Sequence, residues 1–328
     1  MKQMRRRDGL IGLIAAVVGA EATAQQPGKL PLVVFFSPGR PGDFRVTGFE
    51  LGLRDLGLVD GQNIRIEYVY TTGDRLAADA AAIVARGPDV VVATTSAPTQ
   101  AMMKATSTIP IVAAAIADPV SLGMAASLAR PGGNVTGLSL MNLELVAKWV
   151  ELLMEAVPRL ERIGVMSNPD SPAAMLQVQH AVAAAGSLGI DYRVVALSTT
   201  AQGDWAIDAQ FASMRTDGCV GVVVLSDSGL YDWNVAIGRS ALIHGLPVVL
   251  GNAERMTDGV LIAYGANRSD LYRRSAHLME QILRGNKVGE LPFEQPTKFD
   301  LTVNLKTAQA LGLTIPHSIM LRVDEVIE

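Results

Sequence analysis

The chain has 328 residues, 49% of them hydrophobic and 18% charged, with a formal net charge of -4. This composition is typical of a folded α/β protein, and an acidic chain without a basic cluster is a poor match for a protein that binds nucleic acid. A single cysteine, Cys219, excludes an internal disulfide, and its place beside an apolar strand pattern suits a small core residue.

The N-terminus has the pattern of a secretory signal peptide. Lys2 and the arginines at 5–7 precede an apolar segment at 10–20, and Ala22-Thr23-Ala24 supplies an A-x-A cleavage site. The apolar segment is too short for a membrane-spanning helix, which needs about 20 residues. We therefore expect cleavage after residue 24, by the Sec or the twin-arginine route. No cysteine lies near the cleavage site to carry a lipid, so a free periplasmic protein is expected.

In the first half of the mature chain, strands and helices alternate, which is typical of parallel sheets covered by helices. The run from Ile109 to Ser139 predicts a strand, an acidic loop at Asp118, a helix that begins at Pro119, a stop at 130–133 and another strand. The strands predicted in this half are 32–36, 64–69, 90–94, 109–114 and 135–140, and the helices besides the one at Pro119 are 44–56, 75–85 and 97–106.

The second half repeats the same plan without a clear sequence repeat. The strands predicted there are 163–166, 191–196, 220–225, 247–250 and 261–264, and the helices are 143–157, 173–188, 205–215, 233–244 and 269–283. The two half-chains therefore share one α/β architecture, and the length of the chain is sufficient for two lobes.

Two stretches carry a resemblance to a known family. They are IPIVAAAIADPVSLGMAASLARPGGNVTGLS at 109–139 and PTKFDLTVNLKTAQALGLTIPHSIMLRVDEVIE at 296–328. The chain after the leader resembles the ABC transporter substrate-binding proteins of the tryptophan/tyrosine-uptake type. The resemblance implies a type I periplasmic binding protein fold, in which two Rossmann-like lobes with parallel sheets are joined by a three-strand hinge and close around ligand. The implied lobes are 30–140 plus 266–295 and 141–265 plus 296–328, with crossings near 138–142, 264–268 and 293–300.

Short polar residues follow several predicted strands, which is where open α/β sheets bind ligands. Thr95 and Ser96 lie between a strand and a helix, where hydroxyls and unpaired N–H groups suit a carboxylate. Alternatively, Ser96 only caps the helix that has Pro98 in its first turn. Asp118 is placed to meet an α-ammonium group, or else to cap the helix predicted from Pro119.

Further candidates lie at the other strand ends and at the crossings. Ser139 offers a hydroxyl to the ligand or makes ordinary turn hydrogen bonds, and Ser37 begins the turn after the first strand. Asn168 and Asp227 match cleft-facing positions of the family, or else support their own turns. Tyr264 offers both a ring face and a hydroxyl.

The sequence lacks the usual motifs of enzymes. Its four histidines are scattered, and we find no GxSxG elbow, Walker loop, CxxC pair or complete dinucleotide fingerprint. We expect no catalytic residue, no metal and no cofactor. The sequence favours an exported receptor for a small carboxylate, such as an aromatic or other amino acid, that serves the transmembrane subunits of an ABC permease. The alternatives are a periplasmic sensor for a signalling receptor and a racemase- or hydrolase-type enzyme on a similar fold.

Overall fold

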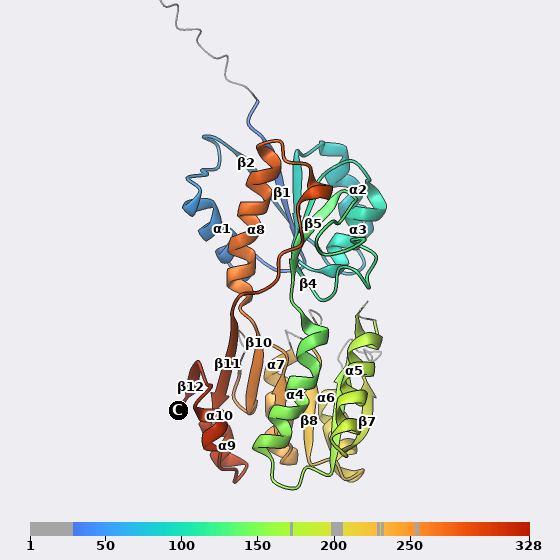
Figure 1. Ribbon diagram of the computed structural model, residues 1–328, viewed down its shortest axis with the longest axis vertical. Helices are drawn as coiled ribbons and strands as arrows, with labels where there is room; N and C mark the ends of the chain where they lie inside the picture. Colours follow the sequence, from blue (N-terminus) through green and yellow to red (C-terminus); the bar gives the residue numbers. More distant parts are fainter. Residues whose placement is uncertain (1–28, 171–172, 198–205, 228–229, 231–232, 253–255) are drawn as a thin grey trace, which may run out of the picture.

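A computed structural model describes residues 29–170, 173–197, 206–227, 230, 233–252 and 256–328. The predicted signal peptide lies outside these residues. The described chain forms two α/β lobes arranged end to end along the longest axis of the molecule (Figure 1). Each lobe has its own sheet, and each sheet has helices on both faces.

The first lobe is built on a parallel sheet in the order β2-β1-β3-β4-β5. Its strands are β1 (Leu32–Ser37), β2 (Arg65–Tyr70), β3 (Val90–Ala93), β4 (Ile111–Ile116) and β5 (Val135–Ser139). Helices α1 (Phe44–Asp55) and α8 (Arg268–Leu283) pack on one face, and α2 (Leu76–Arg86) and α3 (Ser96–Ala105) on the other. Because both faces are covered, β1, β3 and β4 are buried along their whole length.

Two glycines in α1 allow this helix to pack closely against α8. A Cβ atom on Gly48 would lie 2.7 Å from the backbone oxygen of Ser269, and one on Gly52 would lie 2.1 Å from that of Arg273. The contacts advance in the same direction along both helices, so α1 and α8 run parallel and begin at the same end of the lobe. A helix near the N-terminus and one near the C-terminus thereby form one layer.

The second lobe has a sheet in the order β12-β11-β10-β9-β8-β6-β7, in which only the β10–β11 pair is antiparallel. Its strands are β6 (Arg162–Ser167), β7 (Asp191–Ala196), β8 (Gly221–Val224), β9 (Val248–Leu250), β10 (Ile262–Ala266), β11 (Phe299–Asn304) and β12 (Glu325–Ile327). Its helices are α4 (Asn142–Ala156), α5 (Ala174–Ser187), α6 (Ile207–Thr216), α7 (Asn234–His244), α9 (Leu305–Ala310) and α10 (His317–Met320). Helices α4 and α5 cover one face and α6 and α7 the other.

The chain passes between the two sheets three times. It leaves the first lobe after β5, returns from β10 to α8, and leaves again between the 3-10 helix η2 (Val288–Glu290) and β11. The passages are tied to one another: the Ser139 amide donates to the Glu294 carbonyl at 2.9 Å, and the Asn267 side-chain amide donates to Asp300 at 2.7 Å. The three segments therefore form one connected hinge region.

The helix predicted from Pro119 is wrong. Hydrogen bonds from Leu122 to Asp118 and from Met124 to Pro119 close a short turn instead. Gly123 ends this turn because its φ of +68° is left-handed and does not continue an α-helix. The other predicted helices and strands agree with the observed ones to within two residues at each end, and residue 205, where one predicted helix begins, lies outside the described residues. The antiparallel β11, the short helices α9 and α10, and β12 were not separated by the sequence pattern.

Candidate functional site

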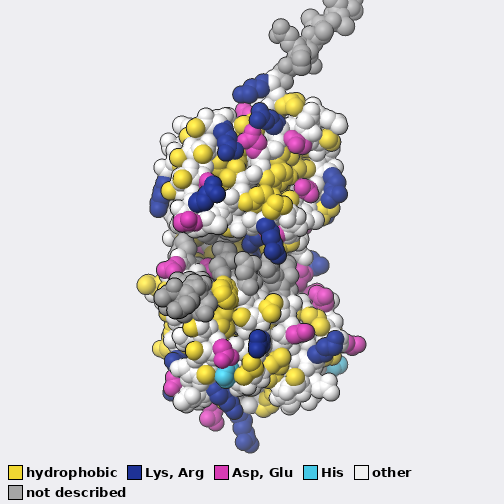
Figure 2. Space-filling model, turned by 180° about the vertical axis from the view of Figure 1, so that it is seen from behind, with side chains coloured by type: hydrophobic (Ala, Val, Ile, Leu, Met, Phe, Trp, Pro, Cys, Tyr) yellow, Lys and Arg dark blue, Asp and Glu magenta, His cyan; other side chains and the backbone are white. Residues whose placement is uncertain are grey.

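The carboxyl ends of the two sets of parallel strands face each other between the lobes. The chain enters the second lobe from the carboxyl end of β5 and the first lobe from the carboxyl end of β10, so both edges lie at the hinge. Figure 2 shows the molecule narrowing there. Ligands of open α/β sheets bind beyond this edge, so the residues that follow these strands are the candidates for the site.

The start of α3 lacks a side-chain cap among the described residues. Thr95 is the N-cap residue, with extended backbone, and Ser96 is the first residue of the helix. Thr95 is only 7% exposed, yet its Oγ1 has no hydrogen-bond partner within the described part of the chain. An uncapped helix N-terminus beside a buried, unpaired hydroxyl can bind an anion.

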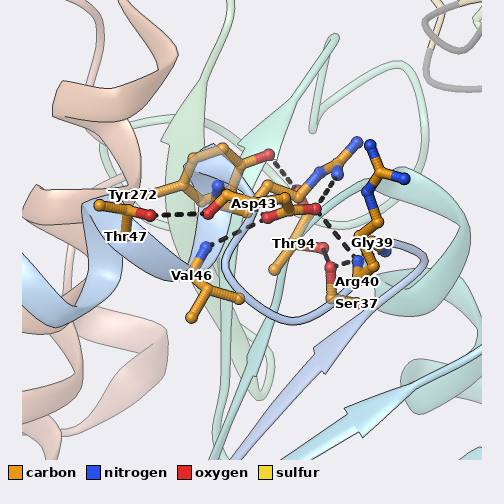
Figure 3. Close-up of polar contacts among 9 residues, drawn as sticks. Ser37, Gly39, Arg40, Asp43, Val46, Thr47, Thr94 and Tyr272 are labelled. Carbon is orange, nitrogen blue, oxygen red and sulfur yellow. Dashed lines mark hydrogen bonds and ion pairs between the residues drawn. The ribbon is translucent and has the colours of Figure 1, made fainter.

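Ser37 uses its hydroxyl within the loop that follows β1. Figure 3 shows Ser37 Oγ accepting from the Gly39 amide and from Thr94 Oγ1, both at 3.0 Å. The Tyr272 hydroxyl, from α8, donates to the Thr94 carbonyl at 2.9 Å. These contacts hold the loop after β1, the end of β3 and the start of α8 together, next to Thr95.

Arg45 is a residue of this edge that the sequence analysis missed. Its Nη1 atom lies 2.6 Å from Oδ2 of Asp43, and the arginine is 5% exposed. Its Nε atom has no partner in the described chain. Burial lowers the pKa of Arg45, but Tyr272 and Asp43 outweigh this effect and raise it above its usual value. The guanidinium is therefore a permanent buried cation. The signal for it was an arginine four residues before Phe49 on the apolar face of the predicted helix.

Asp118 caps its own turn. Its Oδ1 accepts from the amides of Val120 and Ser121 at 3.0 and 3.1 Å, and its Oδ2 accepts from the Ser121 hydroxyl at 2.5 Å. The capping role predicted as the alternative is thus present, although the capped segment is a turn and not a helix. Three donors already satisfy much of the carboxylate.

The second lobe brings Asn168 and Asp227 into contact. The Asn168 side-chain nitrogen donates to Asp227 Oδ1 at 2.7 Å, and its oxygen accepts from the Asp170 amide at 3.0 Å. Asn168 is 8% exposed. The neighbouring Ser226 is held through its backbone by Gln177, which makes hydrogen bonds of 3.0 and 3.1 Å. The two predicted residues therefore form one polar unit at the end of β6 and β8.

Ser139 and Tyr264 make structural contacts at the passages. Ser139 Oγ accepts from the Met141 amide at 3.1 Å and so supports the left-handed turn at Met141, whose φ is +54°. The Tyr264 carbonyl accepts from Trp149 Nε1 at 2.8 Å, and its ring packs on Phe299 with centroids 6.1 Å apart. A role in ligand binding stays a prediction for both residues.

Arg268 connects the two lobes. It is the first residue of α8, which packs in the first lobe, and its Nη2 donates to Ser226 Oγ of the second lobe at 3.1 Å. Burial lowers the pKa of Arg268 to about 10; Tyr272 and Asp227 act against this effect, and the nearby cation of Arg45 adds to it. Two buried arginines therefore begin two adjacent helices at this edge.

The comparison with known families decides what kind of protein carries this site. The family model described as ABC transporter substrate binding protein matches residues 33–327. The chain belongs to this family. Its members are described as substrate-binding proteins of ABC transporters. A curated tyrosine-binding protein of Clostridioides difficile (strain R20291) is 26% identical to this substrate-binding protein over 268 residues, which are 81% of this chain and 76% of the relative.

Solved structures confirm the predicted type I fold of the substrate-binding protein. The ABC domain from Streptococcus pneumoniae, in complex with L-Trp, has a TM-score of 0.83 at 25% identity and covers 91% of this chain and 100% of its own. A conserved domain protein from Vibrio cholerae gives a TM-score of 0.84 at the same identity and coverage. Among the described residues, no helix is long and apolar enough to cross a membrane.

Proposed function

We propose that this substrate-binding protein binds a small carboxylate-bearing ligand between its lobes and delivers it to the transmembrane subunits of an ABC importer. The relatives that bind tyrosine and L-Trp support an amino acid or a similar aromatic acid as the ligand class. The predicted signal peptide supports export to the periplasm.

The observation that carries the proposal is the start of α3. Leaving a buried hydroxyl without a hydrogen bond costs about 1–3 kcal/mol, and Thr95 Oγ1 is such a group. A ligand carboxylate at this point would accept from the hydroxyl and from first-turn amides of α3. The helix dipole would add to the attraction.

Ligand binding in this place would favour closure of the lobes. A ligand shifts a conformational equilibrium only by its differential affinity for the two states, so it must contact both lobes to close them. The Asn168–Asp227 pair presents the polar groups of the second lobe at the opposite edge. We expect a ligand held by Thr95 to meet this pair in the closed form.

We expect Thr95→Val to weaken ligand binding by about 1–2 kcal/mol, because valine keeps the shape of threonine but removes the donor. Calorimetry on the mature protein with L-tryptophan, L-tyrosine and phenylacetate would measure the change for whichever probe binds. Thr106→Val, at the opposite end of α3, serves as the matched control and should leave the affinity unchanged. Equal affinities of wild type and Thr95→Val would argue against a carboxylate at this helix.

A further inference from the structure

We infer that the ligand carries a second acidic group, which binds Arg45 beside the carboxylate site at α3. This inference rests on the proposed function and narrows its ligand class from zwitterionic amino acids to compounds with two acidic groups and a net negative charge. Three observations support the inference: the hydrogen-bond partners of Arg45, the position of two buried arginines at helix N-termini, and the donors that the nearby carboxylates already have.

Arg45 pairs with Asp43, hydrogen-bonds with Tyr272 and stacks over the Phe44 ring at 4.9 Å, which leaves its Nε as the atom without a partner among the described residues. A guanidinium has five N–H donors, and a buried cation needs its donors and its charge satisfied. Asp43 is its acidic neighbour, but this carboxylate is shared among four donors: the amides of Arg40, Arg45 and Val46, and Arg45 Nη1. Nε of Arg45 has no acceptor in the described chain. An acidic group of a ligand would supply that acceptor.

The two buried arginines also lie at helix N-termini, where the helix dipole disfavours a positive charge. Arg45 is the second residue of α1 and Arg268 the first residue of α8, and a cation at a helix N-terminus is unfavourable because of the helix dipole. Since α1 and α8 run parallel, both helix starts point toward the second lobe. An anion placed there would be stabilised by both guanidinium groups and both helix ends. Residues that break a local rule in this way tend to mark functional sites.

The carboxylates described at this edge already have donors. Asp118 accepts from three groups of its own turn, Asp43 from four, and Asp227 from Asn168. Within the described chain, the uncapped α3, Thr95 Oγ1 and Arg45 Nε lack an acceptor, whereas the buried Oδ2 of Asp79, in the first turn of α2, lacks a donor. The excess of donors favours a second anion over the ammonium group of an amino acid.

Tyr272 links the two proposed anion sites, the start of α3 and Arg45. Tyr272 contacts Arg45, and its hydroxyl donates to the carbonyl of Thr94, the residue before Thr95. Figure 3 shows Tyr272 beside Asp43, with its hydroxyl directed at the end of β3. One compact molecule can therefore reach both sites.

Calorimetry with four probes on the mature protein tests the inference: 1,4-phenylenediacetate as the diacid, phenylacetate as the monoacid, and L-tryptophan and L-tyrosine as zwitterions. We expect the diacid to bind at least tenfold more tightly than the other three. Arg45→Gln should remove this advantage and weaken the binding of phenylacetate by much less than the binding of the diacid. Arg45→Lys, which keeps the charge but lacks Nε, should give an intermediate loss.

The matched control is Arg40→Gln. Arg40 belongs to the same loop but is exposed, so its side chain should not affect the preference for the diacid. Circular dichroism would verify that all variants fold. Tighter binding of a zwitterion than of the diacid, with no effect of Arg45→Gln, would overturn the inference and leave the proposed function standing. Binding of none of the four probes would count against both.

Discussion

Trp149→Ala should lower the free energy of unfolding by about 3–5 kcal/mol, since it empties the largest fully buried side-chain volume of the described chain. The indole also donates from Nε1 to the Tyr264 carbonyl, and its ring fills the space beside Gly251, where a Cβ would lie 2.6 Å from the ring. Because α4 follows the first passage and Tyr264 lies in β10 before the second, the indole stabilises the hinge region as well as the core.

Urea unfolding followed by circular dichroism would measure this loss without relying on tryptophan fluorescence. Met154→Ala is the matched control, because Met154 lies on the same helix but is 40% exposed, and we expect its effect to stay within about 0.5 kcal/mol. Similar losses for the two variants would show that the indole is not part of a packed core.

Gly52→Ala should destabilise the protein by about 1–3 kcal/mol, because the added methyl group would lie 2.1 Å from the backbone oxygen of Arg273 and force α1 away from α8. Backbone cannot move aside as a flexible side chain can. The same displacement would separate Arg45 from Arg268, so ligand affinity should fall as well.

Gly186→Ala is the control for the chemical change itself. Gly186 is also within a helix, α5, but a Cβ there meets no atom within 4 Å, so alanine should stabilise the helix by about 0.5–1 kcal/mol. Thermal unfolding of both variants would test the contrast. A Gly52→Ala protein as stable as wild type would mean that α1 and α8 are not in close contact.

Local pattern was sufficient to predict most of the fold. Strong periodicity and clear Gly and Pro punctuation placed the strands and helices, and the family resemblance led to two lobes. The failure at Pro119 has a local cause: a capping aspartate and a proline begin a helical turn whether or not a helix continues, and Gly123 ends it early. An extended crossing was predicted near 293–300, but the antiparallel direction of β11 was not, because strand direction depends on tertiary pairing.

The site was predicted only where it follows directly from strand ends. Thr95, Ser96, Asn168 and Asp227 could be named as candidates because polar residues after parallel strands gather at one edge. Arg45 and Arg268 were missed although Arg45 shares the apolar face of its helix with Phe49, because the sequence does not show that a second helix buries that face. The burial of both arginines depends on the contact between α1 and α8, and these helices are more than 200 residues apart in the chain.

The most direct test of the account is a crystal structure of the mature protein with the tightest-binding of the four probes. We predict that the ligand lies between the lobes, with one carboxylate within hydrogen-bond distance of Thr95 Oγ1 and the first-turn amides of α3. Two pockets elsewhere in the described chain are alternative places for a ligand. One has a volume of about 680 Å³ and lies beside Gly132 and Gly289, and the other has about 450 Å³ and lies beside Trp233 and Arg239. A ligand bound in either of these pockets, with the start of α3 unoccupied, would contradict the account.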